Sequence, residues 1–188
     1  MENKKSVLYH HGIKGQRWGV RRYQNPDGSL TEEGKRRLMY RNRAKSAWKT
    51  KGDVEDIMST WNEQDFKRFD MDPSKPYLTL EQGSNVAKRI VIKDGNIPVS
   101  FFDIFDIGDG KATVAIGTRR GEEFRNKGYA TKAAAKGMQW YDKNKNRIGF
   151  DKITWNPMVE NTASSNIAEK MGFSKVSSNG SWDSYEKR

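Results

Sequence analysis

The sequence predicts an α+β fold, in which a mixed, mostly antiparallel sheet is flanked by helices and preceded by a small basic arm. Three observations predict it. Strand-like segments separated by turns fill residues 87–118, a strand–turn–helix unit occupies residues 112–144, and positive charge is concentrated before residue 52. Consecutive strands that lead into such a unit favour this fold class over a doubly wound nucleotide-binding fold.

The charge is distributed unevenly along the chain. Residues 1–51 hold 14 Lys and Arg against 4 Asp and Glu, a net charge of +10, whereas residues 52–188 have a net charge of +1. A change in composition this sharp predicts a boundary. We therefore expect a basic, Gly-rich docking arm at residues 1–51 and a folded domain at residues 52–188.

The composition excludes several classes of site. The chain has no cysteine, which excludes disulfides, thiolate metal sites and a cysteine nucleophile. The adjacent His10 and His11 have no further ligands beside them and do not predict a metal site. No apolar run is long enough for a secretory signal or a membrane span. We expect a cytoplasmic protein that uses no metal and contacts no membrane.

Residues 7–40 combine glycine, aromatic and basic residues. Glycines at 12, 15 and 19 oppose a stable helix. The stretch Asn25-Pro26-Asp27-Gly28 predicts a turn, and Thr31 is placed to cap a short helix that starts at Glu32.

Three interpretations of residues 7–40 stay open. The first is a basic arm in solvent. The second is nucleic-acid contact, because Trp18, Tyr23 and Tyr40 among basic residues suit base stacking beside phosphate contacts. The third is docking to a protein. The stretch HHGIKGQRWGVRRYQNPDGSLTEEGKRR resembles a segment that recurs in proteins of tailed phages and prophages, attached to head-associated or unrelated domains. This resemblance implies a phage head or other protein as partner, and the virion as a second location.

The folded domain is predicted to open with a helix at residues 53–69. Its apolar residues recur at helical spacing: Val54, Ile57, Met58, Trp61 and Phe69. Asp53 is placed to cap this helix, and Pro73 and Pro76 prevent its continuation.

Strands and turns follow in a regular order. Strands are predicted at residues 87–93, 97–106 and 112–118, with turns at Asp94-Gly95-Asn96 and Gly108-Asp109-Gly110. A helix is predicted from Tyr129 to about residue 144, because apolar residues recur there at helical spacing. Later strands are predicted at residues 152–155, 174–177 and 182–185, and the last two would form a closing hairpin.

The turn before the helix at Tyr129 has the composition of a phosphate cradle. Gly128 lets the backbone approach a ligand closely, and the N–H groups of a first helical turn point outward unpaired at the positive end of the helix dipole. Arg125 and Lys127 add full charges. The turn has neither the Walker A pattern nor the Rossmann glycines, and an ordinary basic surface turn is the alternative interpretation.

A second motif favours the phosphate cradle and indicates a family. Arg125-x-x-Gly128-x-Ala130 resembles the (Q/R)xxGx(G/A) acetyl-CoA loop of GNAT-type N-acetyltransferases. Asn161-x-x-Ser164, which runs into Glu169-Lys170-Met171-Gly172-Phe173, resembles the second signature of that family. The two motifs occur in the family's order, with a predicted helix and strand between them. The resemblance covers roughly residues 53–188 and implies the GNAT fold.

The resemblance implies a role for each part of the two motifs. Backbone N–H groups of the loop would hold the pyrophosphate of acetyl-CoA: Arg125, Asn126, Lys127, Gly128, Tyr129, Ala130 and Thr131. Thr118, Arg119 and Arg120 would pair with the pantetheine arm in the manner of an added strand. Asn161 would contact pantetheine or the acetyl group, and Ser164 or Ser165 would contact the leaving sulfur.

The implied reaction is direct transfer of an acetyl group to an amine acceptor, whose identity the sequence does not reveal. Many relatives carry a tyrosine acid where this chain has Ala168. The pattern is instead similar to that of ribosomal-protein N-terminal and small-amine acetyltransferases. Ser164 or a water is then the candidate acid. Asp103 and Asp106 are candidate bases, and surface carboxylates are the alternative interpretation of both.

Three functional hypotheses follow. The chain is an active acetyl-CoA-dependent N-acetyltransferase that its basic arm targets to a partner. Alternatively, it is a virion-associated or assembly protein whose GNAT-like domain is weakly active or inactive, which the residue at position 168 and the phage-like segment favour. The third hypothesis is a nucleic-acid-binding protein that acts through residues 1–51.

Overall fold

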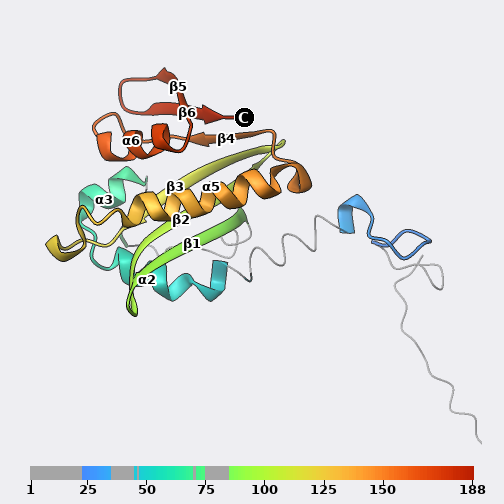
Figure 1. Cartoon of the computed structure of the whole chain (residues 1–188), viewed down its shortest axis with the longest axis horizontal. Coiled ribbons are helices and arrows are strands. Elements are labelled where there is room, and N and C mark those ends of the chain that lie inside the picture. The colour runs from blue at the N-terminus through green and yellow to red at the C-terminus, as the bar shows by residue number, and fades with distance from the viewer. Residues whose placement is uncertain (1–22, 35–44, 46, 70, 75–84) are drawn as a thin grey trace, which may run out of the picture. The chain divides into compact units, whose positions relative to one another are not determined.

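The computed structural model describes residues 23–34, 45, 47–69, 71–74 and 85–188 (Figure 1). The chain divides into two units, Met1–Met39 and Tyr40–Arg188. Each unit is described separately. The predictions made for His10, His11, Trp18 and Tyr40 lie outside the described residues.

The described part of the first unit confirms the predicted turn. The N–H of Gly28 donates to the carbonyl of Asn25 at 2.9 Å, and Gln24 and Leu30 pair as an isolated antiparallel bridge around the turn. The Thr31 hydroxyl accepts a hydrogen bond from the N–H of Gly34 at 3.1 Å, as expected of a helix cap.

The second unit contains a six-stranded sheet in the order β1-β2-β3-β4-β6-β5. The strands are β1 (Val86–Asp94), β2 (Ile97–Gly108), β3 (Lys111–Thr118), β4 (Lys152–Trp155), β5 (Ser174–Ser178) and β6 (Asp183–Lys187). Among these strands only β3 and β4 are parallel neighbours, and the other neighbours are antiparallel. The predicted α+β fold with a mixed, mostly antiparallel sheet is confirmed.

The helices of this unit are α2 (Lys51–Met58), α3 (Glu63–Arg68), the short 3-10 helix η1 (Glu122–Phe124), α5 (Tyr129–Ile148) and α6 (Thr162–Lys170). Helix α5 starts at the predicted residue, and Gly149 ends it in the left-handed conformation. Within the described residues, no helix has both the length and the apolar character needed to cross a membrane.

The prediction of one helix over residues 53–69 is wrong, because a cap divides the segment. The side chain of Asn62 accepts a hydrogen bond from the N–H of Asp65, and the carboxylate of Asp65 accepts one from the N–H of Asn62. This reciprocal arrangement starts a new helix. The N-cap of α2 is Thr50, and Asp53 lies in the first turn.

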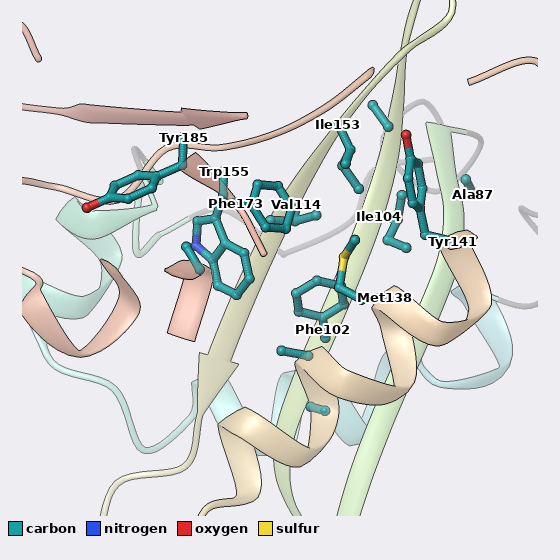
Figure 2. Close-up of a cluster of buried hydrophobic side chains, with 14 of the residues drawn as sticks. Ala87, Phe102, Ile104, Val114, Met138, Tyr141, Ile153, Trp155, Phe173 and Tyr185 are labelled. Carbon is teal, nitrogen blue, oxygen red and sulfur yellow. The ribbon is translucent and has the colours of Figure 1, made fainter. Parts of the chain in front are cut away.

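The core lies on both faces of the sheet. Successive residues of a strand point to opposite faces, and Phe101 and Phe102 of β2 are both fully buried. Phe102 belongs to the larger cluster under α5, which Figure 2 shows with Met138 and Trp155 around it. Phe101 belongs to a smaller cluster with Trp61 and residues of α2. The helices α5 and α2 therefore cover opposite faces.

Candidate functional site

The loop before α5 leaves a run of backbone donors unpaired. The first hydrogen bond of α5 joins the N–H of Lys132 to the carbonyl of Gly128 at 2.9 Å. The N–H groups of residues 126–131 donate no hydrogen bond to any of the described residues. Residues 126–128 are exposed and residues 129–131 are partly exposed. The start of α5 therefore presents six amide donors at the positive end of the helix dipole.

The backbone of this loop depends on left-handed conformations. Asn126 has φ of 57° and Gly128 has φ of 73°. Asn and Gly are the residues that adopt this region most readily. A Cβ built on Gly128 meets nothing within 4 Å, so glycine is required here by the backbone conformation and not by neighbouring atoms.

The side chains of the loop differ in their partners. Arg125 forms an exposed ion pair with Glu122 at 2.8 Å, and Lys127 is exposed. The Tyr129 hydroxyl donates to the carboxylate of Asp94, the last residue of β1, at 2.6 Å. This hydrogen bond raises the pKa of Tyr129. Tyr129 thus fastens the start of α5 to the sheet.

The strands β3 and β4 separate before β3 ends. Their parallel pairing covers three positions and ends at Thr113 and Thr154. The N–H of Arg119, directly after β3, donates to the carbonyl of Val99 in β2 at 2.8 Å. The odd-numbered residues of β3 therefore also point their N–H and C=O groups toward β2. Since these groups alternate along a strand, those of Ile116 point to the edge that β4 has left.

A cavity of about 220 Å³ occupies the gap between the separated strands. It is lined by Thr113 to Ile116 of β3, by Trp155 to Met158 at the end of β4, by Asn161 and Ser164, and by Arg68, Phe69 and Trp182. A gap between two parallel strands leaves backbone groups exposed along the strand edge, and these can pair with an extended ligand arm.

The structure brings Asn161 and Ser164 together at this cavity. Asn161 is the N-cap of α6, and its side-chain oxygen accepts a hydrogen bond from the N–H of Ser164 at 3.2 Å. The hydroxyl of Ser164 accepts a hydrogen bond from Nε1 of Trp155 at 2.9 Å. Because the indole is a donor only, the Ser164 hydroxyl keeps its own proton for another acceptor.

Thr118, Arg119 and Arg120 do not offer the open backbone edge that was expected. The carbonyl of Thr118 accepts a hydrogen bond from Nε1 of Trp61 at 2.8 Å, and the N–H of Arg120 donates to the Thr60 hydroxyl at 2.9 Å. The α2–α3 turn therefore occupies this end of β3. The edge that stays open lies at Ile116.

The side chains of Arg119 and Arg120 are also engaged away from the loop. Arg119 pairs with Asp56 of α2 at 2.9 Å, and Arg120 pairs with Asp65 of α3. The positive charges of both arginines are thus balanced by carboxylates of α2 and α3.

The structure does not support Asp103 as a general base. Asp103 is fully buried, and its two carboxylate oxygens accept hydrogen bonds from Arg89 at 2.7 and 2.5 Å. It does not line the cavity. The other candidate, Asp106, accepts a hydrogen bond from the N–H of Gly108 at the end of β2 and also lies outside the cavity lining.

Several residues that line the cavity were not predicted. Arg68, Phe69, Trp155, Met158 and Trp182 come from three separate parts of the chain. The aromatic residues lie in polar stretches of the sequence, such as the one around Trp182. An aromatic residue in a polar stretch is the one local signal that could have indicated these lining residues.

Comparisons with known proteins agree with this geometry. The family model described as acetyltransferase (GNAT) domain matches residues 16–174. The match begins inside the segment predicted as an arm, and the boundary between the two units, after Met39, also lies before residue 51. A search of curated proteins finds no match.

Solved structures show the same fold at low sequence identity. A GNAT-family acetyltransferase from Streptococcus pneumoniae is 12% identical, with a TM-score of 0.56, over 77% of this chain and 94% of that chain. An N-acetyltransferase from Staphylococcus aureus is 14% identical, with a TM-score of 0.54, over 73% of this chain and 93% of that chain. The GNAT domain of PAT from S. lividans is 12% identical, with a TM-score of 0.54, over 74% of this chain and 85% of that chain.

One further match is partial. The chain covers 63% of an acetyltransferase from Salmonella typhimurium, at 11% identity over 53% of this chain and with a TM-score of 0.44, and this match is too weak to add support. The family model spans most of the sequence, and the fold agrees with it, so together they identify the family. The chain belongs to the GNAT acetyltransferase family.

Proposed function

We propose that the protein is an acetyl-CoA-dependent N-acetyltransferase that moves the acetyl group directly to an amine acceptor. The observation that carries this proposal is the run of six unpaired amide donors at residues 126–131, at the start of the helix that follows β3, in a sheet where β3 and β4 separate. A diphosphate has the charge and the acceptor oxygens that such a helix start binds. The exposed Lys127 adds positive charge at the same place.

The rest of acetyl-CoA fits the gap between the strands. The amide groups of the pantetheine arm would pair with the open edge of β3 at Ile116, as an added strand does. This course leads from the loop into the cavity that Asn161 and Ser164 line. The side-chain oxygen of Asn161 caps α6, which leaves its amide N–H groups to donate to a ligand carbonyl.

The residues at the cavity suit the steps of acetyl transfer. The neutral amine nitrogen forms a bond to the carbonyl carbon and loses a proton to water, the carbon–sulfur bond breaks, and the thiolate takes a proton. Ser164 or a water is the proposed proton donor, since Trp155 donates to the Ser164 hydroxyl and leaves its proton available. Holding the two reactants in line can supply about 7–11 kcal/mol of the barrier, and acid catalysis adds about 10²–10⁴-fold.

A matched pair of glycine variants tests the proposal. Gly128 and Gly149 lie at opposite ends of α5, both are left-handed, and neither has an atom within 4 Å of a built Cβ. Gly128→Asp places a carboxylate against the bound diphosphate and should abolish acetyl-CoA binding in calorimetry. Gly149→Asp imposes the same backbone strain at the other end and should leave the affinity intact. If the wild type does not bind acetyl-CoA, the proposed function is wrong.

We also propose that residues 1–51 are a docking arm beside a catalytic domain at residues 52–188. The net charge of +10 in the first 51 residues supports an arm that seeks a partner. The resemblance of residues 10–37 to a segment of phage proteins supports a phage or prophage origin, with activity in the host cytoplasm or association with the virion.

The nature of the partner can be tested in the full chain. Changing Arg21, Arg22, Arg36 and Arg37 to Gln removes four charges from the arm. Retention on DNA that falls steeply with salt, and is lost in this variant, would favour nucleic acid as the partner. Co-sedimentation with phage heads, without DNA retention, would favour docking to protein.

A further inference from the structure

The cavity reaches from the acetyl-transfer residues to the opposite face of the sheet. Asn161 and Ser164 line it from α6, on the side covered by α5, whereas Phe69 packs with Trp61 in the cluster under α2. Figure 1 shows α3 and α6 at the same end of the sheet. Because the loop at residues 126–131 starts α5, an acceptor that meets the acetyl group would enter from the α3 side.

The charge on the α3 side is positive. Among the described residues that line the cavity, Arg68 is the one charged residue, and no carboxylate is present. Arg68 contacts Asp65 at 3.4 Å, but the same carboxylate accepts two hydrogen bonds from Arg120. Two guanidinium groups thus share one carboxylate. Burial opposes ionisation of Asp65, but hydrogen bonds from Arg120 and the Asn62 N–H outweigh it and lower its pKa.

The remaining wall on this side is apolar. Phe69, Met158 and Trp182 line the cavity with Arg68. The cavity of about 220 Å³ must also admit the acetyl end of acetyl-CoA, so it leaves less room for the acceptor than the pockets of about 300–1,000 Å³ that hold drug-sized ligands. These properties select a small acceptor that has an apolar side chain and a group to pair with Arg68.

Building on the function proposed above, we propose that the acceptor is a free α-amino acid with an apolar or aromatic side chain. Its carboxylate would pair with Arg68, its side chain would pack against Phe69 and Trp182, and its amine would face the acetyl group. A nearby cation favours the neutral form of an amine, which is the nucleophilic form, so Arg68 would also help to activate the acceptor. A polyamine would meet a like charge in place of a carboxylate partner.

Kinetics with matched amines test the acceptor class. The full-length protein is assayed at saturating acetyl-CoA with L-phenylalanine, with phenethylamine, which lacks the carboxylate, and with spermidine. L-phenylalanine should have a kcat/KM at least about tenfold above those of the other two amines, since a hydrogen bond to a charged group contributes about this factor.

Variants of α3 show whether Arg68 is responsible. Arg68→Gln should reduce the ratio of kcat/KM for L-phenylalanine over phenethylamine by about tenfold or more. The intrinsic basicity of each amine cancels when this ratio is compared between variants. Lys67→Gln removes the same charge from the same helix at an exposed residue outside the cavity lining, so it should leave the ratio unchanged.

The outcomes separate this inference from the proposed function. Equal or better turnover of phenethylamine or spermidine, or an equal loss for both aromatic amines in Arg68→Gln, would overturn the amino-acid acceptor and leave acetyl transfer standing. Acetyl-CoA binding in calorimetry without turnover of L-phenylalanine, L-methionine or L-tryptophan would also overturn it. A protein that does not bind acetyl-CoA would refute both proposals.

Discussion

The strand β3 divides into two parts that differ in what lies beside them. From Lys111 to Thr113 it pairs with β2 on one edge and β4 on the other, whereas from Val114 to Thr118 it keeps β2 and has lost β4. The first part, here called the closed part, holds the sheet together. The second, the open part, borders the cavity. The same strand therefore holds the sheet together at one end and borders the proposed ligand site at the other.

The sequence after β4 explains why the strands separate. β4 ends at Trp155 and is followed by Asn156 and Pro157. Proline has no N–H to donate to a neighbouring strand, and it restricts the backbone of the residue before it. The chain then turns into α6 at Asn161. Pairing with β3 cannot continue past this point, and the cavity follows from that interruption.

The largest effect on stability is expected from Asp103→Asn. The variant leaves Arg89 buried without its ionic partner, and breaking a buried pair costs about 3–5 kcal/mol. Urea unfolding would measure the loss of stability, and calorimetry on the folded fraction should show unchanged acetyl-CoA affinity. A variant as stable as the wild type but without activity would instead restore Asp103 as a base.

The next largest effect separates the two parts of β3 directly. Ile153 of β4 is fully buried against the closed part, so Ile153→Ala should cost about 2–5 kcal/mol of unfolding free energy. Ile116→Ala in the open part, where the side chain is partly buried, should cost less. It should raise the KM for acetyl-CoA, because Ile116 lines the cavity proposed for the pantetheine arm. If both variants changed only stability, the division of the strand would be wrong.

A smaller effect is expected from Trp155→Phe, which removes the donor to Ser164 and keeps most of the ring. The loss of stability should be about 1–3 kcal/mol, and kcat should fall while the KM for acetyl-CoA stays nearly constant. Trp140→Phe changes a partly buried indole on α5 outside the cavity lining and serves as the control. Equal kcat values in both variants would show that the hydrogen bond does not assist the reaction.

The smallest effect is expected from Tyr141→Phe under α5. Burial, and then the charges of Asp142 and Asp151, raise the pKa of Tyr141 to about 12. Since the folded state holds the phenol proton more tightly, stability should be present below about pH 10 and lost as the pH rises toward about 12. The Tyr141 hydroxyl has no hydrogen-bond partner among the described residues.

Removing that hydroxyl should therefore raise the unfolding free energy by about 1 kcal/mol and flatten its decrease at alkaline pH. Thermal unfolding between neutral pH and pH 12 measures both effects. An unchanged alkaline decrease in Tyr141→Phe would assign the titration to another group.

Features that depend on neighbours in sequence could be predicted. Turn chemistry at Gly95 and Gly128 and the apolar spacing of α5 each involve residues a few positions apart. The donor loop at residues 126–131 could be located for the same reason. The division between α2 and α3 was missed, although the Asn62–Asp65 capping box is also local, because the apolar spacing continues across it.

The sequence by itself determined the order of strands and helices, the loop that starts α5 and the family, since local spacing and short motifs encode them. Only the tertiary structure decided which polar residues face the cavity. It placed Asp103 in a buried pair with Arg89, joined Trp155 to Ser164, and brought Arg68 and Trp182 to one cavity. Burial and long-range pairing depend on how distant segments pack, and a periodic pattern in one segment does not contain that information.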